Sequence, residues 1–274
     1  MLLYFLFAFF STVSVYQNKN TITSDSTQKW KEAWSVSVQG NAIDVDNLGD
    51  VYLVANQDLI KYKNNGQLFR SYSNKSLGSI SSIDVSNPLK ILLFYKDLSR
   101  LAFIDNTLTE QKESLYLERF EREFSSLACT SNDENGIWLY APVAFSLTRY
   151  NPKMNIKAEV KNINQLTGKA INPTWMIERG NRLYLVDTQN GILTFDIFGT
   201  YLKTIPLKGI TKLWVAGEML VALNDKRELL TSSLSGIEQE TIALPTADFI
   251  DICWNGGKIY MLDKQRLTVY EALN

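Results

Sequence analysis

Three aspartates stand at matching places in this chain and are its first candidates for chemistry. Asp44, Asp84 and Asp251 each follow an apolar residue in a short run that is predicted to form an inner strand of a repeated unit. Converging carboxylates could bind Ca²⁺ or another hard cation, which prefers oxygen ligands, or share protons with raised pKa values. Each could equally accept backbone N–H bonds from the neighbouring unit. The same position in the other three units holds Ala128, Met176 and Trp214.

Tryptophans form the second candidate set. Trp175, Trp214 and Trp254 lie at or near inner strands, whereas Trp138 lies in a second strand and should pack between units. Surfaces that bind sugars or peptides use such rings, and so does the packing of one unit on the next. The sequence leaves both open and predicts a ligand-binding site at the mouth of a central channel, made of Asp44, Asp84, Asp251, Trp175, Trp214 and Trp254.

Several chemistries are excluded because the chain contains no histidine. This absence removes Ser-His-Asp and Cys-His catalysis and histidine-ligated zinc. No P-loop, G-x-S-x-G, CxxC or GxGxxG pattern is present, and the acidic segment 130–136 lacks the spacing of an EF-hand and indicates an exposed turn. An enzyme built on this chain would have to use carboxylates, Lys, Tyr or a cofactor.

The elements that must position these residues recur about every forty residues. Six apolar runs begin at intervals of 40, 46, 46, 36 and 40 residues, at Val51, Ile91, Ile137, Leu183, Met219 and Ile259. In the first repeat, strands are expected at 42–46, 51–55, 58–63 and 67–73, with a hairpin turn at 64–66, where Asn and Gly tolerate positive φ. Four antiparallel strands per repeat predict an all-β, six-bladed β-propeller.

The ends of the chain support ring closure. The sixth repeat lacks a fourth strand, and a surplus strand at 33–38 precedes the first repeat. We therefore expect this N-terminal strand to pair antiparallel with residues 266–271 and complete the last blade, which leaves no open seam.

One stretch also resembles a known family. Ile43, Val45, Asp46, Gly49, Tyr52, Leu53 and Val54 follow a pattern similar to the blade signature of NHL-type and related six-bladed propellers, and Ile60, Tyr62 and Gly66 extend it. The resemblance implies a six-bladed propeller, a fold commonly used for binding, and carries over no catalytic residue.

The composition of the N-terminus predicts an export signal. Residues 1–16 form an apolar stretch too short for a membrane span, with Thr12 and Ser14 suited to a cleavage site, although the basic start of a signal peptide is missing. A retained anchor and an unexported strand are the alternatives. We expect a signal peptide at 1–16, a flexible polar segment at 17–32 and the propeller at 33–274.

Only two cysteines are present. Cys129 and Cys253 fall on the inner strands of repeats three and six, which lie on opposite sides of a six-membered ring. A disulfide needs Cα atoms within about 7 Å of each other, so we expect two buried free thiols.

The expected function is binding. A net charge of −1 gives no general attraction to nucleic acid or anionic lipid. We expect an exported, periplasmic or extracellular propeller of the cell envelope, monomeric on its own, without a resident cofactor or stable membrane insertion, that binds a protein partner. The alternatives are a carboxylate- or metal-dependent lyase or hydrolase, with Ca²⁺ as the candidate ion, and a carbohydrate-binding propeller. Fold alone does not choose between them.

Overall fold

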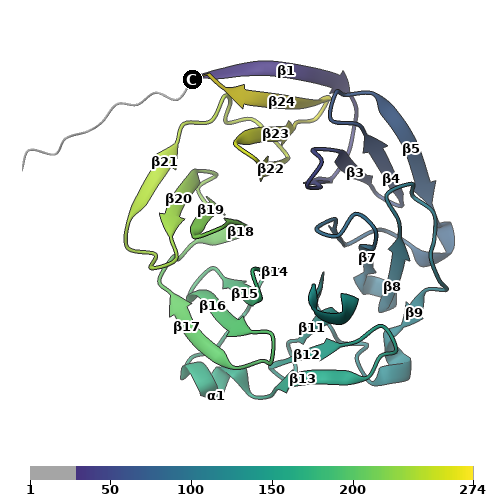
Figure 1. Cartoon of the computed structure of the whole chain (residues 1–274), viewed down its shortest axis with the longest axis vertical. Coiled ribbons are helices and arrows are strands. Elements are labelled where there is room, and N and C mark those ends of the chain that lie inside the picture. Colours follow the sequence, from purple (N-terminus) through teal and green to yellow (C-terminus); the bar gives the residue numbers. More distant parts are fainter. Residues whose placement is uncertain (1–28, 274) are drawn as a thin grey trace, which may run out of the picture.

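Six four-stranded antiparallel sheets surround a central axis in the computed structural model, which describes residues 29–273 (Figure 1). The predicted six-bladed β-propeller is confirmed. In blades 1 to 5 the strands follow chain order from the axis outward, because hairpins connect neighbouring strands, whereas in blade 6 the first strand of the chain takes the outer position. The alternation of apolar and polar residues with Gly- and Asn-rich turns produces this pattern.

The first three blades run from the inner to the outer strand as follows. Blade 1 contains β2 (Ala42–Val45), β3 (Val51–Ala55), β4 (Asp58–Tyr62) and β5 (Leu68–Ser73). Blade 2 contains β6 (Ser82–Asp84), β7 (Ile91–Tyr95), β8 (Arg100–Ile104) and β9 (Leu115–Tyr116). Blade 3 contains β10 (Leu127–Thr130), β11 (Ile137–Ala141), β12 (Ser146–Tyr150) and β13 (Ile156–Val160).

The last three blades close the ring. Blade 4 contains β14 (Trp175–Arg179), β15 (Arg182–Asp187), β16 (Gly191–Asp196) and β17 (Tyr201–Ile205). Blade 5 contains β18 (Ile210–Ala216), β19 (Met219–Asn224), β20 (Leu229–Ser233) and β21 (Gln239–Ile242). Blade 6 contains β22 (Asp251–Asn255), β23 (Lys258–Leu262) and β24 (Arg266–Ala272), and its outer strand is β1 (Trp30–Ser37).

The closing strand is where the sequence predicts it. β1 pairs antiparallel with β24, from Trp30 opposite Ala272 to Ser37 opposite Arg266, and Figure 1 shows this junction of the two ends of the chain. β1 begins at Trp30, three residues before the expected boundary at 33, so residues 30–32 belong to the propeller. The predicted signal peptide at 1–16, and residues 17–28 of the expected polar segment, lie outside the described residues.

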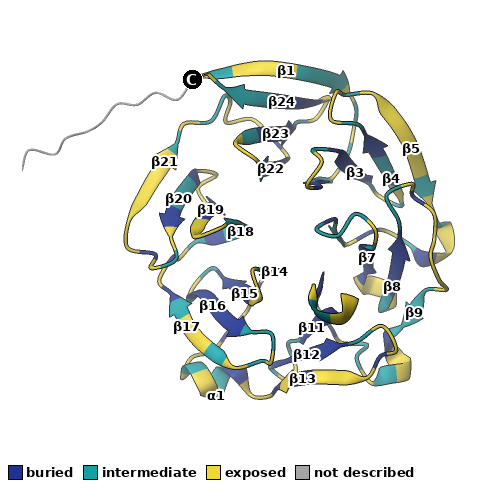
Figure 2. Cartoon of the chain, viewed as in Figure 1, coloured by how far each residue is buried: buried dark blue, intermediate teal, exposed yellow. Residues whose placement is uncertain are grey.

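The hydrophobic core is divided among the six seams between blades. Each cluster of buried residues contains side chains from two adjacent blades: for example, Trp138 of blade 3 lies in one cluster with Leu185 of blade 4, and Leu53 of blade 1 lies with Leu262 of blade 6. Second and third strands are buried on both faces and outer strands are exposed (Figure 2). Because every blade needs both neighbours to cover its faces, closure of the ring contributes to the stability of all six.

Two local details differ from the expected plan. The outer strand of blade 2 is only Leu115–Tyr116 rather than 112–117, because the chain turns into a 3₁₀ helix at Leu117–Phe120. A short helix not predicted from the sequence, α1 (Ile163–Thr167), connects blades 3 and 4. Among residues 29–273, no helix combines the length and the apolar character needed to cross a bilayer.

Candidate functional site

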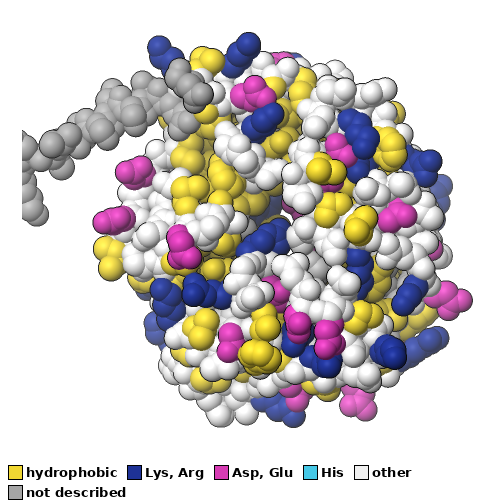
Figure 3. Space-filling model, in the orientation of Figure 1, with side chains coloured by type: hydrophobic (Ala, Val, Ile, Leu, Met, Phe, Trp, Pro, Cys, Tyr) yellow, Lys and Arg dark blue, Asp and Glu magenta, His cyan; other side chains and the backbone are white. Residues whose placement is uncertain are grey.

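A cavity of about 630 Å³ lies on the propeller axis and receives lining residues from all six blades. Figure 3 shows a hollow near the centre of the ring. Its volume falls in the range of small-molecule and cofactor sites, roughly 300–1,000 Å³. Its walls mix serine, proline and aliphatic side chains with three tryptophans and four charged residues. Five of the six residues predicted to form a channel-mouth site line it: Asp44, Asp84, Trp175, Trp214 and Trp254.

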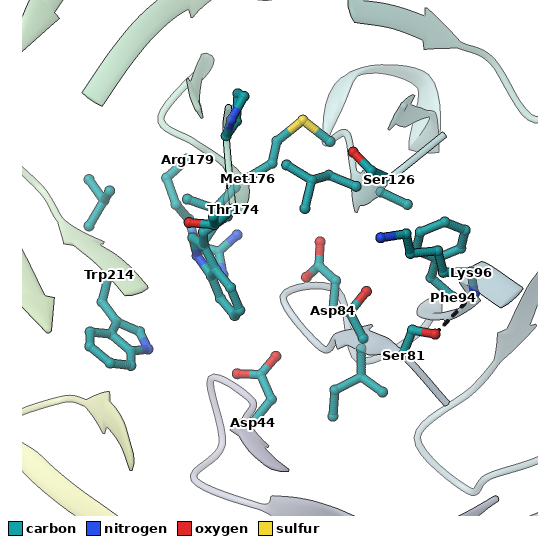
Figure 4. A pocket seen from close by; sticks show the side chains of 18 of the residues that line it. Asp44, Ser81, Asp84, Phe94, Lys96, Ser126, Thr174, Met176, Arg179 and Trp214 are labelled. Carbon is teal, nitrogen blue, oxygen red and sulfur yellow. Dashed lines mark hydrogen bonds between the residues drawn. The ribbon is translucent and has the colours of Figure 1, made fainter. Parts of the chain in front are cut away.

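Asp44 and Asp84 come from the inner strands of blades 1 and 2. Figure 4 shows their carboxylates pointing into the same cavity. The N–H groups of Val45, at 2.9 Å, and Val85, at 3.3 Å, donate to Asp44. Burial, and after it the charge of Asp84, raises the pKa of Asp44 from 3.8 to about 6 despite these bonds.

Asp84 in turn binds blade 3. Its Oδ2 accepts hydrogen bonds from the backbone N–H and the hydroxyl of Thr130, both at 2.7 Å, and its Oδ1 accepts one from the N–H of Ser86 at 2.9 Å. The side chain therefore lines the cavity and fastens two blades together.

Asp251 is placed differently and does not line the cavity. Its Oδ2 accepts a hydrogen bond from the N–H of Ile43 at 2.9 Å, and its Oδ1 is paired with Lys212 of blade 5. It therefore joins blades 5, 6 and 1. The backbone bonds between adjacent blades that were predicted for the three aspartates are present in each case, from Asp251 to blade 1, from Asp44 to blade 2 and from Asp84 to blade 3.

The proposed alignment of inner-strand positions is wrong in four blades. Asp44 pairs with Tyr52, and Asp84 pairs with Leu92, each the second residue of its apolar run. Asp251 instead pairs with Leu262, the fourth residue of the run that begins at Ile259. Ala128, Met176 and Trp214 pair with third residues of their runs, Leu139, Leu185 and Val221. The inner strands begin at different positions relative to the second strands they pair with. Counting from the first apolar residue of each inner strand therefore does not identify equivalent positions, and a shift of one residue moves a side chain to the other face.

The three tryptophans line the cavity and also pack in the seams between blades. Trp175 is grouped with the seam between blades 4 and 5, and Trp254 with the seam between blades 5 and 6. Trp214 contacts the two seams that flank blade 6 (Figure 4). Nζ of Lys212 lies 5.4 Å from the ring centroid of Trp175, and the indole Nε1 of Trp175 is buried without a hydrogen-bond partner. The two alternatives for these residues, packing and a rim open to ligands, are therefore both compatible with their positions.

Two cationic residues of the cavity were not foreseen. Arg179, at the end of β14, and Lys96, directly after β7, line the cavity together with Asp84 (Figure 4). Nη1 of Arg179 donates to the backbone oxygen of Glu178 at 2.8 Å. The available signal was the charged pair Glu178-Arg179 at the end of an inner strand that begins with three apolar residues.

The structural role of Glu178 was also not predicted from the sequence. Its carboxylate accepts hydrogen bonds from Nε1 of Trp138 at 2.6 Å and from the N–H of Asn132 at 2.9 Å, and it is buried. It braces blade 4 against blade 3, and Trp138 packs between blades as predicted.

The other predicted sites can also be placed. In the described part of the chain, no three Cys, Asp or Glu side chains form a group suited to a metal ion. Cys129 and Cys253 are buried free thiols on β10 and β22, as predicted. Sγ of Cys253 lies 3.9 Å from Oδ1 of Asp44, beside the cavity.

The chain matches no protein-family model and no curated protein sequence. It is similar in structure to a catalytically inactive histidine-to-alanine variant of virginiamycin B lyase from Staphylococcus aureus with quinupristin (TM-score 0.60, 14% identity, covering 89% of this chain and 100% of that one). It is also similar to the WD40 domain of Neurospora crassa Pan2 (TM-score 0.59, 7% identity, 90% and 97%). A third similar structure is BamB from Moraxella catarrhalis (TM-score 0.53, 8% identity, 89% and 98%). At these identities the likeness concerns the fold.

Proposed function

We propose that this protein is an exported, non-enzymatic binding propeller of the cell envelope, which holds a segment of a partner protein in its axial cavity. The observation that carries the proposal is the composition of that cavity, in which three tryptophans and charges of both signs meet at the junction of all six blades. Tryptophan and arginine are the residues that most often dominate binding energy at protein interfaces. The rigid blades hold them in fixed positions, which lowers the entropic cost of binding.

An enzymatic role is the second candidate, and one observation favours it. The pKa of Asp44, raised to about 6 mainly by burial, suits a group that exchanges protons near neutral pH. The similar lyase variant lost activity when a histidine was replaced by alanine, and this chain has no histidine. A lyase or hydrolase here would have to rely on the charged residues of the cavity, with Asp44 and Asp84 as its carboxylates, alone or with a bound ion.

The experiment that tests the binding function fills the cavity with a large side chain and leaves the hydrophobic core unchanged. Ser126 lines the cavity and carries a small side chain (Figure 4), so Ser126→Trp should fill part of the space. Ser71→Trp, on the exposed outer strand β5, introduces the same side chain far from the axis. Tagged versions of the wild type and both variants are expressed in the native host, crosslinked in the intact envelope and purified, and the captured proteins are quantified by mass spectrometry.

We expect the same partner to be captured by the wild type and by Ser71→Trp, and to be lost with Ser126→Trp while the melting temperature of that variant stays near the wild-type value. Equal capture by all three proteins would contradict a role for the cavity. A small molecule that the wild type converts and Asp44→Asn does not would instead support the enzyme, and selective retention on glycans would support the carbohydrate-binding alternative.

Export has its own test. The apolar stretch at 1–16 predicts that the mature protein in the native host begins near residue 15–17. Intact-mass analysis of the protein purified from the periplasm or the medium should show this loss. A full-length protein in the cytoplasm, with Met1 or its processed form at the N-terminus, would contradict export.

A further inference from the structure

The charged side chains of the axial cavity have no ionic partners among the described residues. Asp44, Asp84, Arg179 and Lys96 all line the cavity, and none of them belongs to an ion pair within 4.0 Å. Nearby, Asp251 is paired with Lys212 outside the cavity wall. The carboxylate of Asp251 therefore has a cationic partner, whereas those of Asp44 and Asp84, which face the cavity, have none within 4.0 Å among the described residues.

The two cavity carboxylates repel each other. Asp44 and Asp84 project from adjacent blades into one space (Figure 4), and the charge of Asp84 acts with burial against ionisation of Asp44. A cation beside the two would offset this repulsion and favour the charged form of Asp44, as the charge of Arg179 already does in part. The space that Asp44 and Asp84 both face is therefore suited to a positive group.

A second, independent feature calls for a hydrogen-bond acceptor. Trp175 lines the same cavity, and its indole Nε1 is buried without a hydrogen-bond partner among the described residues, which costs free energy until an acceptor reaches it. Arg179 uses one N–H on a backbone oxygen of its own strand and keeps further donors on its guanidinium. A ligand oxygen on this side of the cavity would satisfy both residues.

We propose that the cavity recognises a peptide segment through a basic side chain, with the guanidinium or ammonium group held between Asp44 and Asp84 and a backbone oxygen of the peptide accepting from Trp175 and Arg179. This inference rests on the proposed binding function and specifies its ligand. A peptide is favoured over a bare metal ion because Ca²⁺ requires six to eight oxygens, whereas the described residues offer no group of three acidic side chains. The apolar and aromatic wall suits the methylene stem of arginine or lysine.

The direct test compares two probes that differ only in charge. N-acetyl-arginine amide carries the guanidinium, and N-acetyl-citrulline amide has nearly the same shape without the charge. We expect calorimetric titration of the full chain at pH 7.5 to show binding of the arginine probe at least about tenfold tighter than that of the citrulline probe, the ratio expected when hydrogen bonds to ionised groups are lost. Equal affinities, or no binding of either probe, would overturn the proposal.

Variants locate the site of binding. Asp44→Asn and Asp84→Asn should each reduce the preference for arginine over citrulline, because each removes one of the two charges. Asp58→Asn removes a charge from the exposed start of β4 and should leave the preference unchanged. If Asp58→Asn lowers the preference as much as the cavity variants, the effect is a general one of net charge, and the proposed site is wrong.

Acidification gives a readout that a purely structural role would not produce. The groups near Asp44 are Asp84, Arg179, Cys253 and the Lys212–Asp251 pair. Because Asp44 takes up a proton near pH 6, affinity for the arginine probe should fall by up to about tenfold per pH unit below that point, while the weak binding of citrulline should not change. An arginine affinity that is constant from pH 7.5 to 5 would contradict the assignment.

A calcium titration and the partner capture separate the remaining explanations. Stoichiometric binding of Ca²⁺ that excludes the arginine probe would assign the carboxylates to a metal and overturn the proposal. If Ser126→Trp loses the native partner but the double variant Asp44→Asn/Asp84→Asn captures it normally, the cavity binds a partner and the inference of a basic segment fails. If both lose it, the basic segment and the binding function stand together.

Discussion

The indole of Trp34 lies directly on Gly66, so a Cβ atom built on Gly66 would be 2.9 Å from Cε3 of Trp34. Trp34 belongs to β1 at the edge of blade 6, whereas Gly66 lies in the β4–β5 turn of blade 1. The indole Nε1 also donates to the backbone oxygen of Asn64 at 2.8 Å. The closing strand is thus attached to the first blade as well as to the last.

Substitution of Gly66 should measure this attachment. Gly66 has a φ of +84° and Gly217 a φ of +60°, but a Cβ on Gly217 would meet no atom within 4 Å. Alanine at either position should cost about 1–2 kcal/mol for the left-handed backbone, and Gly66→Ala should cost at least about 1 kcal/mol more because of the overlap with Trp34. Urea unfolding measures both, and the excess should vanish in a Trp34→Ala background. An excess that persists there would show that the contact is not its cause.

Removal of the closing strand should affect the whole ring. A chain that begins at residue 39 loses β1 and its pairing with β24, together with the partly buried Trp34 and Val36 of the seam between blades 6 and 1. Large apolar side chains contribute about 1.5–3 kcal/mol each when fully buried, so we expect a marked drop in melting temperature. The control begins at residue 29 and keeps all of β1. Equal melting temperatures for these two truncations would contradict closure by β1.

The bond between Trp138 and Glu178 predicts that a conservative change is damaging. Both oxygens of Glu178 accept hydrogen bonds, from Trp138 and from the N–H of Asn132, and glutamine would present an NH₂ group to one of these donors. Glu178→Gln should therefore destabilise the protein by about 1–3 kcal/mol. In a Trp138→Phe background, where one donor is gone, the cost should be smaller. A double-mutant cycle from urea unfolding measures the difference, and strictly additive costs would rule out this account.

The architecture could be predicted from the sequence because its signals are local. The apolar runs at Val51 and Ile259, the turn at 64–66 and the surplus strand before residue 39 each reflect period-two alternation or turn chemistry within a few residues. These signals fix the number of strands and their order. They also suffice to place Trp175 and Trp254 near the axis, since both adjoin inner strands.

The details of the cavity depend on register, which is not a local property. Asp251 was grouped with Asp44, although the pairing of β22 with β23 places it two positions away along the inner strand. Arg179 and Glu178 were missed because only the closed ring brings Arg179 into a cavity with Asp84, and only the neighbouring blade supplies the partners of Glu178. Contacts between blades join residues about forty positions apart, and no periodic pattern in one blade specifies them.

The two cysteines should behave as unreactive thiols. Burial is the main cause that raises the pKa of both thiols well above the usual value, and the nearby carboxylates Asp84 and Asp44 add to it. We expect a thiol reagent such as 5,5′-dithiobis(2-nitrobenzoate) to leave the native protein unmodified and to titrate two thiols after unfolding without reductant. Fewer than two thiols in the unfolded, unreduced protein would indicate a disulfide and contradict the placement of β10 and β22 in separate blades.

The last prediction concerns Asp44 and the pH dependence of stability. The folded state raises its pKa from 3.8 to about 6, chiefly through burial, so between these values the native protein binds a proton that the unfolded chain has released. Stability conferred by this group is present below pH 4 and is lost as the pH rises through 6. Asp44→Asn cannot ionise and avoids this loss. Relative to the wild type, its unfolding free energy should therefore rise between pH 4 and pH 7, by at most about 3 kcal/mol at 1.36 kcal/mol per pKa unit.

The measurement is favourable in this chain because it contains no histidine that would titrate in the same window, and because Lys90, whose pKa burial lowers to about 8, titrates above it. Urea unfolding of the wild type and Asp44→Asn at pH 4.5, 5.5, 6.5 and 7 gives the difference directly. Asp84→Asn is the contrast: it weakens the acceptor of two bonds from Thr130 and should lose stability at pH 7. A difference between Asp44→Asn and the wild type that does not change with pH would show that Asp44 is solvated like an ordinary surface carboxylate, and it would remove the electrostatic basis for a cation between Asp44 and Asp84.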